Sequence, residues 1–323
     1  MHIAFFIGNG FDLAHNAKTR YSDFLETYKK KSPVNKVAEQ MIKEINNDVQ
    51  TWADMERRLG LFTEKVSSVA DFEIFYYDLL DSMRSYLSKE DGRIAVTEEE
   101  KILSDIWRPE KYLNPLEQHG FQQFMDSFAH TAIYSYVISF NYTNILERMM
   151  GYKGQKIQLK NRYINAPYQI SEVYKIHGAL NGTPILGVND TSQITNKTFA
   201  NDVDVCDYLV KPQSNTVLGT LVDTHCRNII SEANLFILHG LSLGDTDKTW
   251  WQLIGNRLTQ VPNTCVIYFL HSPRTFTQIN ATKIASAKRQ AQDYLCSRCD
   301  ISDKLRDNVK KRIYVSINSD FMV

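Results

Sequence analysis

The chain has 323 residues, of which 43% are hydrophobic and 23% charged, a composition typical of a folded globular protein rather than a disordered one. Lys plus Arg and Asp plus Glu both number 37, so no overall basic charge indicates nucleic acid or an anionic membrane as the main partner. No apolar run approaches the roughly 18 residues that span a bilayer, and strand-like residues begin at position 2, which leaves no room for a signal segment. We therefore expect a cytoplasmic protein that contacts neither membrane nor nucleic acid.

The five cysteines do not form the even, closely spaced framework of a secreted disulfide protein. Cys296 and Cys299 have the spacing of half a zinc site, but no second pair of Cys or His residues accompanies them. We expect reduced thiols and no metal.

The N-terminal stretch carries the first functional signal. Five apolar residues, Ile3 to Ile7, predict a strand buried on both faces, and Gly8-Asn9-Gly10 predicts a tight turn into a helix. A strand, a glycine-rich turn and a helix open many nucleotide-binding α/β units, because N–H groups at the helix start attract a pyrophosphate. Residue 13 is Leu where the dinucleotide fingerprint has its third glycine, so an ordinary turn between strand and helix stays an equal alternative.

Residues 19–136 show helical periodicity almost throughout. Apolar side chains recur at spacings of three and four from Trp52 to Val69 and again from Phe72 to Leu87, which predicts long amphipathic helices. We interpret these stripes as the core of a helical insertion subdomain rather than as a cofactor site.

Polar residues then follow two further predicted strands. Asn141 comes directly after the short apolar strand Tyr136 to Phe140, and His177 follows a strand-like approach from Tyr174. Ligands of open α/β sheets bind outside the carboxyl ends of the strands, so we expect Asn141 to face the same crevice as Gly8 to Asp12. A lone histidine is more often structural, so His177 is a candidate site residue only in combination with the other predicted site residues.

The C-terminal half repeats the strand-helix alternation. Leu235 to His239 predicts a buried strand that ends at Gly240 and Ser242, and two more strands at 264–270 and 312–317 flank a helix at about 275–295. Residues 191–230 are polar and irregular, and we expect them to lie over the site. The pattern predicts an α/β fold with a Rossmann-like parallel sheet, helices on both faces and a large all-helical insertion after the first strand-helix unit. The nucleotide-binding domain then comprises residues 1–18 and 137–323, and the insertion comprises residues 19–136.

Several short motifs together resemble the AbiH family of bacterial phage-defence (abortive infection) proteins. The resemblance spans nearly the whole chain and rests on the order and spacing of Gly8 to His15, Thr19-x-Tyr21-x-x-Phe24, Trp52-x-x-x-Glu56, Ser139 to Thr143, Ile176-His177-Gly178, Leu186 to Asn189 and Gly240-x-Ser242-Leu243-Gly244-x-x-Asp247. It implies a role in antiviral defence.

AbiH proteins in turn resemble the sirtuin-like NAD-binding fold of several bacterial defence NADases. This resemblance implies that Gly8, Asn9, Gly10, Phe11 and Asp12 hold the pyrophosphate of NAD. It places Asn141 and His177 beside the nicotinamide ribose, and Gly240 with Ser242 on the adenosine side. The chain lacks the four-cysteine zinc module of deacetylating sirtuins, so the resemblance favours NAD cleavage without an acyl-lysine partner.

Cleavage of the nicotinamide bond of NAD expels a neutral leaving group and needs an oriented water in a negative environment. We expect the Asn141 amide to orient the ribose hydroxyls and that water, and His177 to accept a proton. Asp12 could hold the nicotinamide amide. The alternative is a non-catalytic sensor in which NAD or ADP-ribose switches a protein partner that contacts the helical insertion. A homo-oligomer and a defence-system partner both remain open.

Overall fold

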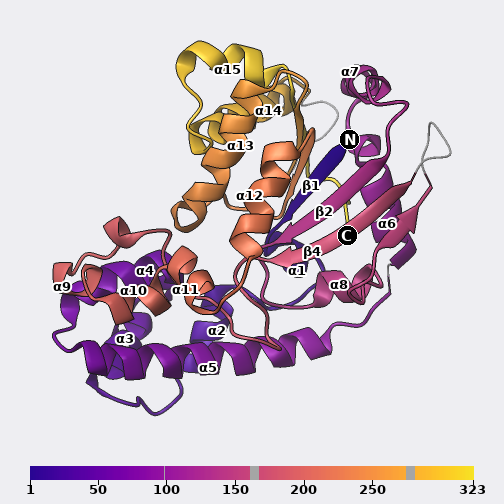
Figure 1. Ribbon diagram of the computed structural model, residues 1–323. Helices are drawn as coiled ribbons and strands as arrows, with labels where there is room; N and C mark the ends of the chain where they lie inside the picture. The colour runs from indigo at the N-terminus through magenta and orange to yellow at the C-terminus, as the bar shows by residue number, and fades with distance from the viewer. Residues whose placement is uncertain (98, 161–166, 274–280) are drawn as a thin grey trace.

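The fold is built on one mixed sheet. The computed structural model describes residues 1–97, 99–160, 167–273 and 281–323. Its seven strands lie in the order β3-β4-β2-β1-β5-β6-β7, and every described neighbouring pair is parallel except β3 with β4 (Figure 1). The strands are β1 His2–Ile7, β2 Ile133–Ser139, β3 Ile157–Leu159, β4 Tyr168–Lys175, β5 Leu235–His239, β6 Cys265–Leu270 and β7 Ile313–Ile317. The predicted α/β class is thus confirmed, with a mostly parallel sheet.

Strand β1 lies at the centre and is buried on both faces, as its unbroken apolar run predicts. Ile3, Phe5 and Ile7 join one hydrophobic cluster, whereas Ala4 and Phe6 join another. This alternation follows from the strand geometry, in which successive side chains point to opposite faces. Two apolar layers therefore cover the sheet.

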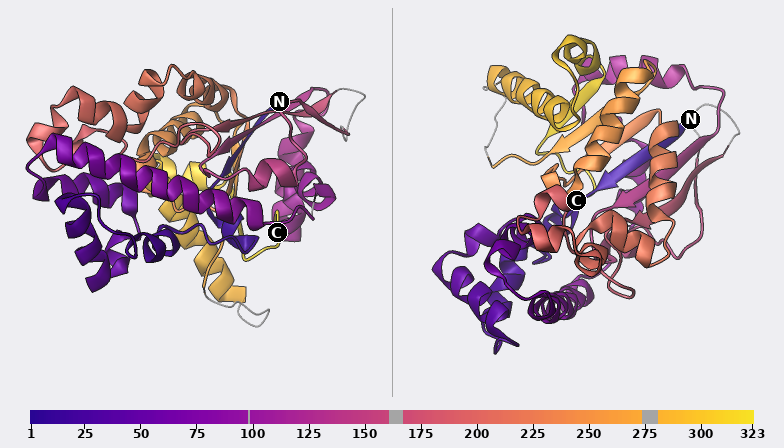
Figure 2. Two further views of the ribbon diagram at one scale, coloured as in Figure 1. Left: turned by 90° about the horizontal axis from the view of Figure 1, so that it is seen from below. Right: turned by 60° about the vertical axis from the view of Figure 1, so that its left-hand side comes forward.

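Helices form both layers (Figure 2). The face that receives Phe5 is covered by the short helices α1 Gly10–Ala14 and α8 Ile145–Met149 and by α6 Glu99–Trp107, η3 Pro109–Tyr112 and α7 Pro115–Asp126. The face that receives Phe6 is covered by α12 Val222–Glu232, α13 Lys248–Gln260, α14 Ala281–Arg298 and α15 Asp303–Lys310.

A separate helical bundle lies at the carboxyl ends of the central strands, to the lower left in Figure 1. It contains α2 Tyr21–Tyr28, α3 Lys36–Asn47, η1 Val49–Trp52, α4 Met55–Phe62, η2 Thr63–Lys65 and the 25-residue α5 Val69–Arg93. A later segment completes it with η4 Thr191–Gln193, α9 Lys197–Ala200, α10 Val203–Leu209 and α11 Lys211–Val217. Tyr76 of α5 ties the two parts together, because its hydroxyl lies 2.7 Å from Leu186 O and 2.8 Å from Tyr208 O.

The packing divides the chain differently from the expected insertion at residues 19–136. Helices α6 and α7 fall inside that range but pack on the sheet through Ile106 and Phe121. Leu186 and Leu209 fall outside it but pack in the bundle. Helical periodicity shows which face of a helix is apolar and not which partner covers that face, so the pattern did not separate these groups.

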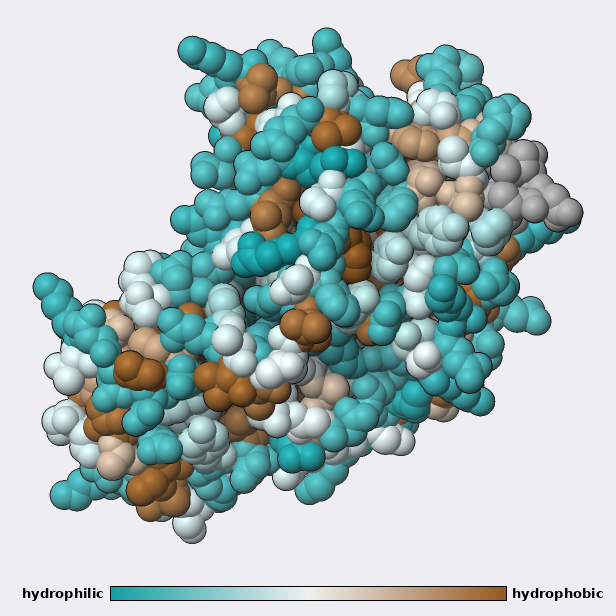
Figure 3. Space-filling model, viewed as in Figure 1, coloured by the Kyte–Doolittle hydropathy of each residue, from teal (hydrophilic) through white to brown (hydrophobic). Residues whose placement is uncertain are grey.

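None of the helices in the described ranges has the length and hydrophobicity needed to cross a bilayer. Hydrophobic side chains on the face shown in Figure 3 occur as separate patches, several of them over the bundle, among hydrophilic residues.

Candidate functional site

A cleft of about 740 Å³ opens at the carboxyl ends of β1 and β5. Strand β2 lies beside β1 on one side, and β5, which comes later in the sequence, lies beside β1 on the other side. The strand order therefore reverses its direction at β1, and the cleft lies at this reversal point. Its walls come from the loops after both strands and from the bundle, including Arg20, Tyr21 and Glu56. A crevice at this point of a parallel sheet is the usual ligand site of open α/β folds.

The two glycine loops of the cleft pack directly on each other. Gly8 N donates to His239 O at 2.9 Å, and Gly10 N donates to Gly240 O at 2.9 Å. A Cβ atom on Gly8 would lie 2.5 Å from Gly240 O, and Gly240 itself has a φ of +68°. The glycines are therefore required for the contact between the loops, and the N–H groups of Gly8 and Gly10 are already bonded within the protein.

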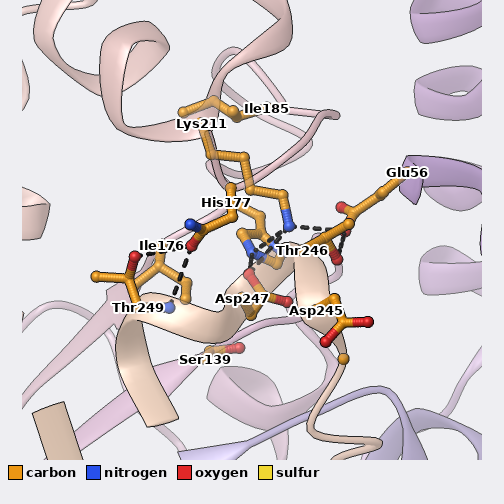
Figure 4. A network of polar contacts seen from close by, with 12 residues as sticks. Glu56, Ser139, Ile176, His177, Ile185, Lys211, Asp245, Thr246, Asp247 and Thr249 are labelled. Carbon is orange, nitrogen blue, oxygen red and sulfur yellow. Dashed lines mark hydrogen bonds and ion pairs between the residues drawn. The ribbon is translucent and has the colours of Figure 1, made fainter. Parts of the chain in front are cut away.

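A network of charged side chains lies at the wall of the cleft, and Glu56, His177 and Asp247 of this network line the cleft (Figure 4). His177 Nε2 lies 2.8 Å from Asp247 Oδ1, and Lys211 Nζ lies 3.0 Å from the same oxygen. Lys211 Nζ also lies 2.6 Å from Glu56 Oε2 and 3.2 Å from His177 Nε2. Thr246 Oγ1 donates to Glu56 Oε2 at 2.8 Å. Four segments that are distant in the sequence thus meet through their side chains.

The opposite charges hold each other ionised. Burial works to lower the pKa of Lys211, but the carboxylates of Asp247 and Glu56 outweigh burial, so its pKa lies above the usual lysine value. Burial would raise the pKa of Asp247, yet Lys211 and His177 hold that pKa well below its usual range. Asp247 is therefore a carboxylate and Lys211 an ammonium ion at neutral pH.

The second oxygen of Glu56 contacts two phenols. Tyr21 donates to Glu56 Oε1 at 3.1 Å, and the hydroxyl of Tyr142 lies 3.4 Å from it. Burial and the charge of Glu56 raise the pKa of both tyrosines well above their usual value, so both remain donors. Glu56 belongs to α4 of the bundle, and its contacts fix the bundle against the sheet end.

A small side chamber of about 90 Å³ adjoins the cleft, and Asn9, Arg20, Tyr21 and Phe140 line both cavities. Asn141 Nδ2 donates to Asp12 Oδ1 at 2.9 Å beside this chamber, while its buried Oδ1 accepts no hydrogen bond from any residue that the structure describes.

The Asp12 carboxyl is also buried and accepts a hydrogen bond from Thr143 Oγ1 at 2.6 Å. Burial raises the pKa of Asp12 to about 7, although hydrogen bonds from Thr143 and Asn141 work to lower it. The amide of Asn141, whose Oδ1 has no hydrogen-bond partner among the described residues, thus lies beside a carboxyl group that is partly protonated at neutral pH.

The structure divides the predicted site residues between these two cavities. Gly8, Asn9, Gly10, His177, Gly240 and Ser242 line the cleft, and Asn9, Asp12 and Asn141 line the side chamber. The Phe11 side chain is fully buried in the sheet core. Within the described ranges, no group of three or more His, Cys, Asp and Glu side chains is arranged to hold a metal ion.

The sequence analysis assigned no part in the site to Glu56, Lys211 or Asp247, although Asp247 was a candidate for the cap of the helix that is α13. Glu56 and Asp247 do end two of the motifs quoted above, so a signal for both was present. Lys211 lies in the polar segment 191–230, which was expected over the site but shows no motif of its own. Its contact with Glu56 joins residues 155 positions apart in the sequence.

Comparison with known families places the charged network and both glycine loops within one family model. The model described as bacteriophage abortive infection AbiH matches residues 4–269. The chain belongs to the AbiH family. All of the cleft residues that the sequence motifs share with AbiH, from Gly8 to Asp247, lie inside the matched segment. No curated protein matches the chain significantly.

Proposed function

We propose that this AbiH protein acts in phage abortive infection by binding NAD in the cleft and hydrolysing it to nicotinamide and ADP-ribose. The observation that carries the proposal is a cleft at the carboxyl ends of β1 and β5 in which His177 is hydrogen-bonded to the largely buried Asp247 carboxylate. A histidine oriented by a carboxylate is a common arrangement for a general base.

The order of the strands supports a nucleotide as the ligand. The six parallel strands, numbered in chain order without β3, lie as 3-2-1-4-5-6. This is the order of Rossmann-like dinucleotide-binding sheets, whose ligand lies at the reversal point beside the first strand. A cavity of about 740 Å³ also falls in the range of about 300–1,000 Å³ that small-molecule and cofactor sites occupy. We also propose that this fold is sirtuin-like, as the resemblance of the motifs implies.

The charges in the cleft support cleavage through a cationic transition state. Three carboxyl groups, Asp54, Glu56 and Asp247, line the cleft, and Arg20 is the one Lys or Arg among its described lining residues. Breaking the bond between C1′ and the nicotinamide nitrogen leaves the electron pair on nicotinamide and develops positive charge on the ribose. Nearby carboxylates stabilise that charge. Water then adds to C1′ and its proton passes to His177.

The side chamber supports a role for Asn141 and Asp12 at the nicotinamide end. Asn9 and Phe140 line both cavities, so a ligand that spans the boundary would bring its ribose past Asn9. The unpaired Oδ1 of Asn141 is an acceptor for a ribose hydroxyl, a water or an amide N–H group. The Asp12 carboxyl lies 2.9 Å from the same amide and can also accept from a carboxamide.

The test is incubation of purified protein with NAD, with nicotinamide and ADP-ribose followed by chromatography. His177→Ala and Asn141→Ala should each lower the rate by roughly two to four powers of ten, because each removes a positioned polar group. His225→Ala is the matched control, since His225 is an exposed histidine on α12. Wild-type rates in both site variants would show that the assignment is wrong.

A second candidate is the non-catalytic sensor, which the composition of the cleft wall favours. Arg20, Tyr21 and Glu56 come from the bundle side, whereas Gly240 and Ser242 come from the sheet, so a bound nucleotide would touch both parts. Binding would then change how the bundle sits on the sheet and could switch a partner. NAD that binds measurably without release of nicotinamide would favour this function over hydrolysis.

A further inference from the structure

Lys175, the last residue of β4, lies beside the turn that carries Asn141. Strands β2 and β4 are parallel neighbours with Ser139 opposite Lys175, so the lysine side chain starts level with the end of β2 (Figure 1). Its Nζ atom lies 3.3 Å from Asn141 O and 3.5 Å from Tyr142 O, and it also donates to Thr143 O. Three consecutive backbone carbonyls therefore converge on one amino group.

Two of these carbonyls depend on Lys175 alone. Among the residues that the structure describes, no other donor bonds to Asn141 O or to Thr143 O, whereas Tyr142 O also accepts from a backbone N–H group. A lysine amino group has three N–H donors, so it can serve several acceptors at once. Loss of this side chain would leave both carbonyls of the turn without a partner.

The position of Lys175 is itself fixed by an ion pair. Its Nζ lies 2.9 Å from Glu147 Oε1 of α8, and the two side chains are only 12% and 13% exposed. Because α8 follows the turn directly in the sequence, this pair holds the end of β4 and the start of the next helix on the same amino group.

The opposite side of the turn contacts Asp12. Asn141 Nδ2 donates to Asp12 Oδ1 at 2.9 Å, and Thr143 Oγ1 donates to Asp12 Oδ2 at 2.6 Å. The turn is thus held at its carbonyls by Lys175 and at its side chains by Asp12. Asn141 lines the side chamber, but Lys175 lines neither that chamber nor the cleft. A ligand in these cavities would contact Asn141 and not Lys175.

We propose that Lys175 is a positioning residue, which binds the carbonyls of the turn and thereby holds the Asn141 amide against Asp12 at the wall of the side chamber. The positioning rests on the contacts, whereas its value for NAD cleavage rests on the proposed function, in which Asn141 orients the ribose hydroxyls and the attacking water. Lys175 acts through Asn141 and does not touch the reacting atoms.

The first experiment is NMR of the protein labelled at asparagine, which measures hydrogen exchange of the Asn141 side-chain amide. Its signals are assigned by their absence in Asn141→Ala. Exchange of this buried amide requires the turn to open, so it should be about tenfold faster or more in Lys175→Met, which loses a hydrogen bond from a charged donor. Asn215 is 4% exposed, like Asn141, and is the internal reference, because a general loss of stability would speed both amides.

Lys288→Met is the matched control variant. Lys288 is also a largely buried lysine in an ion pair, 2.6 Å from Glu117 Oε2, and it lines neither the cleft nor the side chamber. The Asn141 amide should exchange at the wild-type rate in this variant. That result would show that loss of a buried lysine does not by itself release the turn.

Kinetics test whether Lys175 acts through Asn141. Where NAD is hydrolysed, Lys175→Met should lower kcat by about tenfold to a hundredfold, because a displacement of about 1 Å at a reacting centre has a cost of that order. Lys175→Met/Asn141→Ala should be no slower than Asn141→Ala alone, since a residue that acts only through Asn141 then has nothing left to position. Losses that multiply in the double variant would contradict the proposal.

Two NMR results would also overturn it: wild-type exchange of the Asn141 amide in a folded Lys175→Met protein, or an increase that Asn215 shares equally. If Lys175→Met does not fold, Lys175→Met/Glu147→Met removes both members of the ion pair and leaves neither unpaired, and its Asn141 amide should show the same faster exchange. The NMR measurement requires no NAD. Faster exchange in the variant, without nicotinamide release by the wild type, would therefore refute the proposed hydrolysis and leave the positioning role in place.

Discussion

Asp12 shows how a single buried carboxyl can link stability to pH. Its side chain is 1% exposed, and burial raises its pKa to about 7 from an ordinary value of 3.8. The folded state therefore binds this proton more tightly than the unfolded state does. The contribution of Asp12 is fully present below about pH 4 and is lost as pH rises from about 4 to about 7. Above about pH 7, the buried ionised carboxyl lowers the free energy of unfolding.

Asp12→Asn should remove the destabilisation that the ionised carboxyl causes above pH 7. An amide at position 12 could accept from Thr143 and donate to the unpaired Oδ1 of Asn141 after a flip of the Asn141 amide. We expect the free energy of unfolding at pH 8 to rise by roughly 1 to 4 kcal/mol, with little change at pH 4. Urea unfolding at both pH values measures this. A variant that is less stable than the wild type at pH 8 would show that the ionised carboxyl is well accommodated.

Individual side chains also mark the limit of what the sequence could predict about the site. His177 and Asn141 were identified because each directly follows an apolar strand, and their neighbours belong to recognisable motifs. Lys211 has no such marker, because its partners Glu56 and Asp247 lie 155 and 36 residues away and meet it only in the folded chain. A buried ion pair is created by tertiary structure, and local composition carries no sign of it.

At the scale of elements, the glycine loop has a structural function that is independent of any ligand. A Cβ atom at Gly10 would overlap the backbone of Gly240, and one at Gly240 would lie 2.7 Å from Phe11 N. Gly10→Ala and Gly240→Ala should therefore each destabilise the fold by about 1–3 kcal/mol, the usual cost of forcing extra atoms into a packed contact. Loss of NAD binding in either variant would not by itself demonstrate a phosphate-binding loop.

Gly244→Ala provides the comparison for these variants. Gly244 lines the same cleft, but a Cβ atom there would lie 3.7 Å from Ser242 Oγ, an ordinary van der Waals distance. We expect its urea midpoint to equal that of the wild type. If Gly10→Ala were as stable as Gly244→Ala, the packing of the two loops would not need glycine, and a ligand-binding role for Gly10 would gain support.

Elements with a strong local signal were predicted well. The apolar runs at Ile3 to Ile7 and Leu235 to His239 correspond to β1 and β5, and the helix expected at 275–295 corresponds in part to α14. Part of its expected span, 275–280, lies outside the described residues. The short antiparallel strand β3 was missed, because three residues of mixed polarity give no period. Helices α6 and α7 were predicted as helices but assigned to the insertion at residues 19–136, since their packing on the sheet depends on the fold of the whole chain.

At the scale of the whole molecule, the cleft depends on two parts that have separate hydrophobic cores. The bundle core contains Trp52 and Phe75, whereas the sheet cores contain Phe5 and Phe6. Glu56 is a polar link between them, because one oxygen of its carboxylate accepts a hydrogen bond from Thr246 and lies 2.6 Å from Lys211, whose ammonium also contacts Asp247. A ligand in the cleft would therefore stabilise the contact between the two parts and not only its own binding loop.

Hydrogen exchange measured with and without NAD tests that expectation. Segments on both sides of the cleft line it: residues 20–22 and α4 on the bundle side and residues 240–247 on the sheet side. With NAD at a hundredfold excess over its dissociation constant, exchange that requires opening of the cleft should slow by up to about a hundredfold in all three segments. Helix α7, which packs on the sheet and contributes no residue to the cleft, should exchange at the same rate in both samples. Protection confined to 240–247 would mean that the nucleotide does not reach the bundle, and Glu56 would then have no direct part in binding. Protection in all three segments would follow if the charged network and the glycine loops form one site, because a ligand bound between them must be released before either side can open.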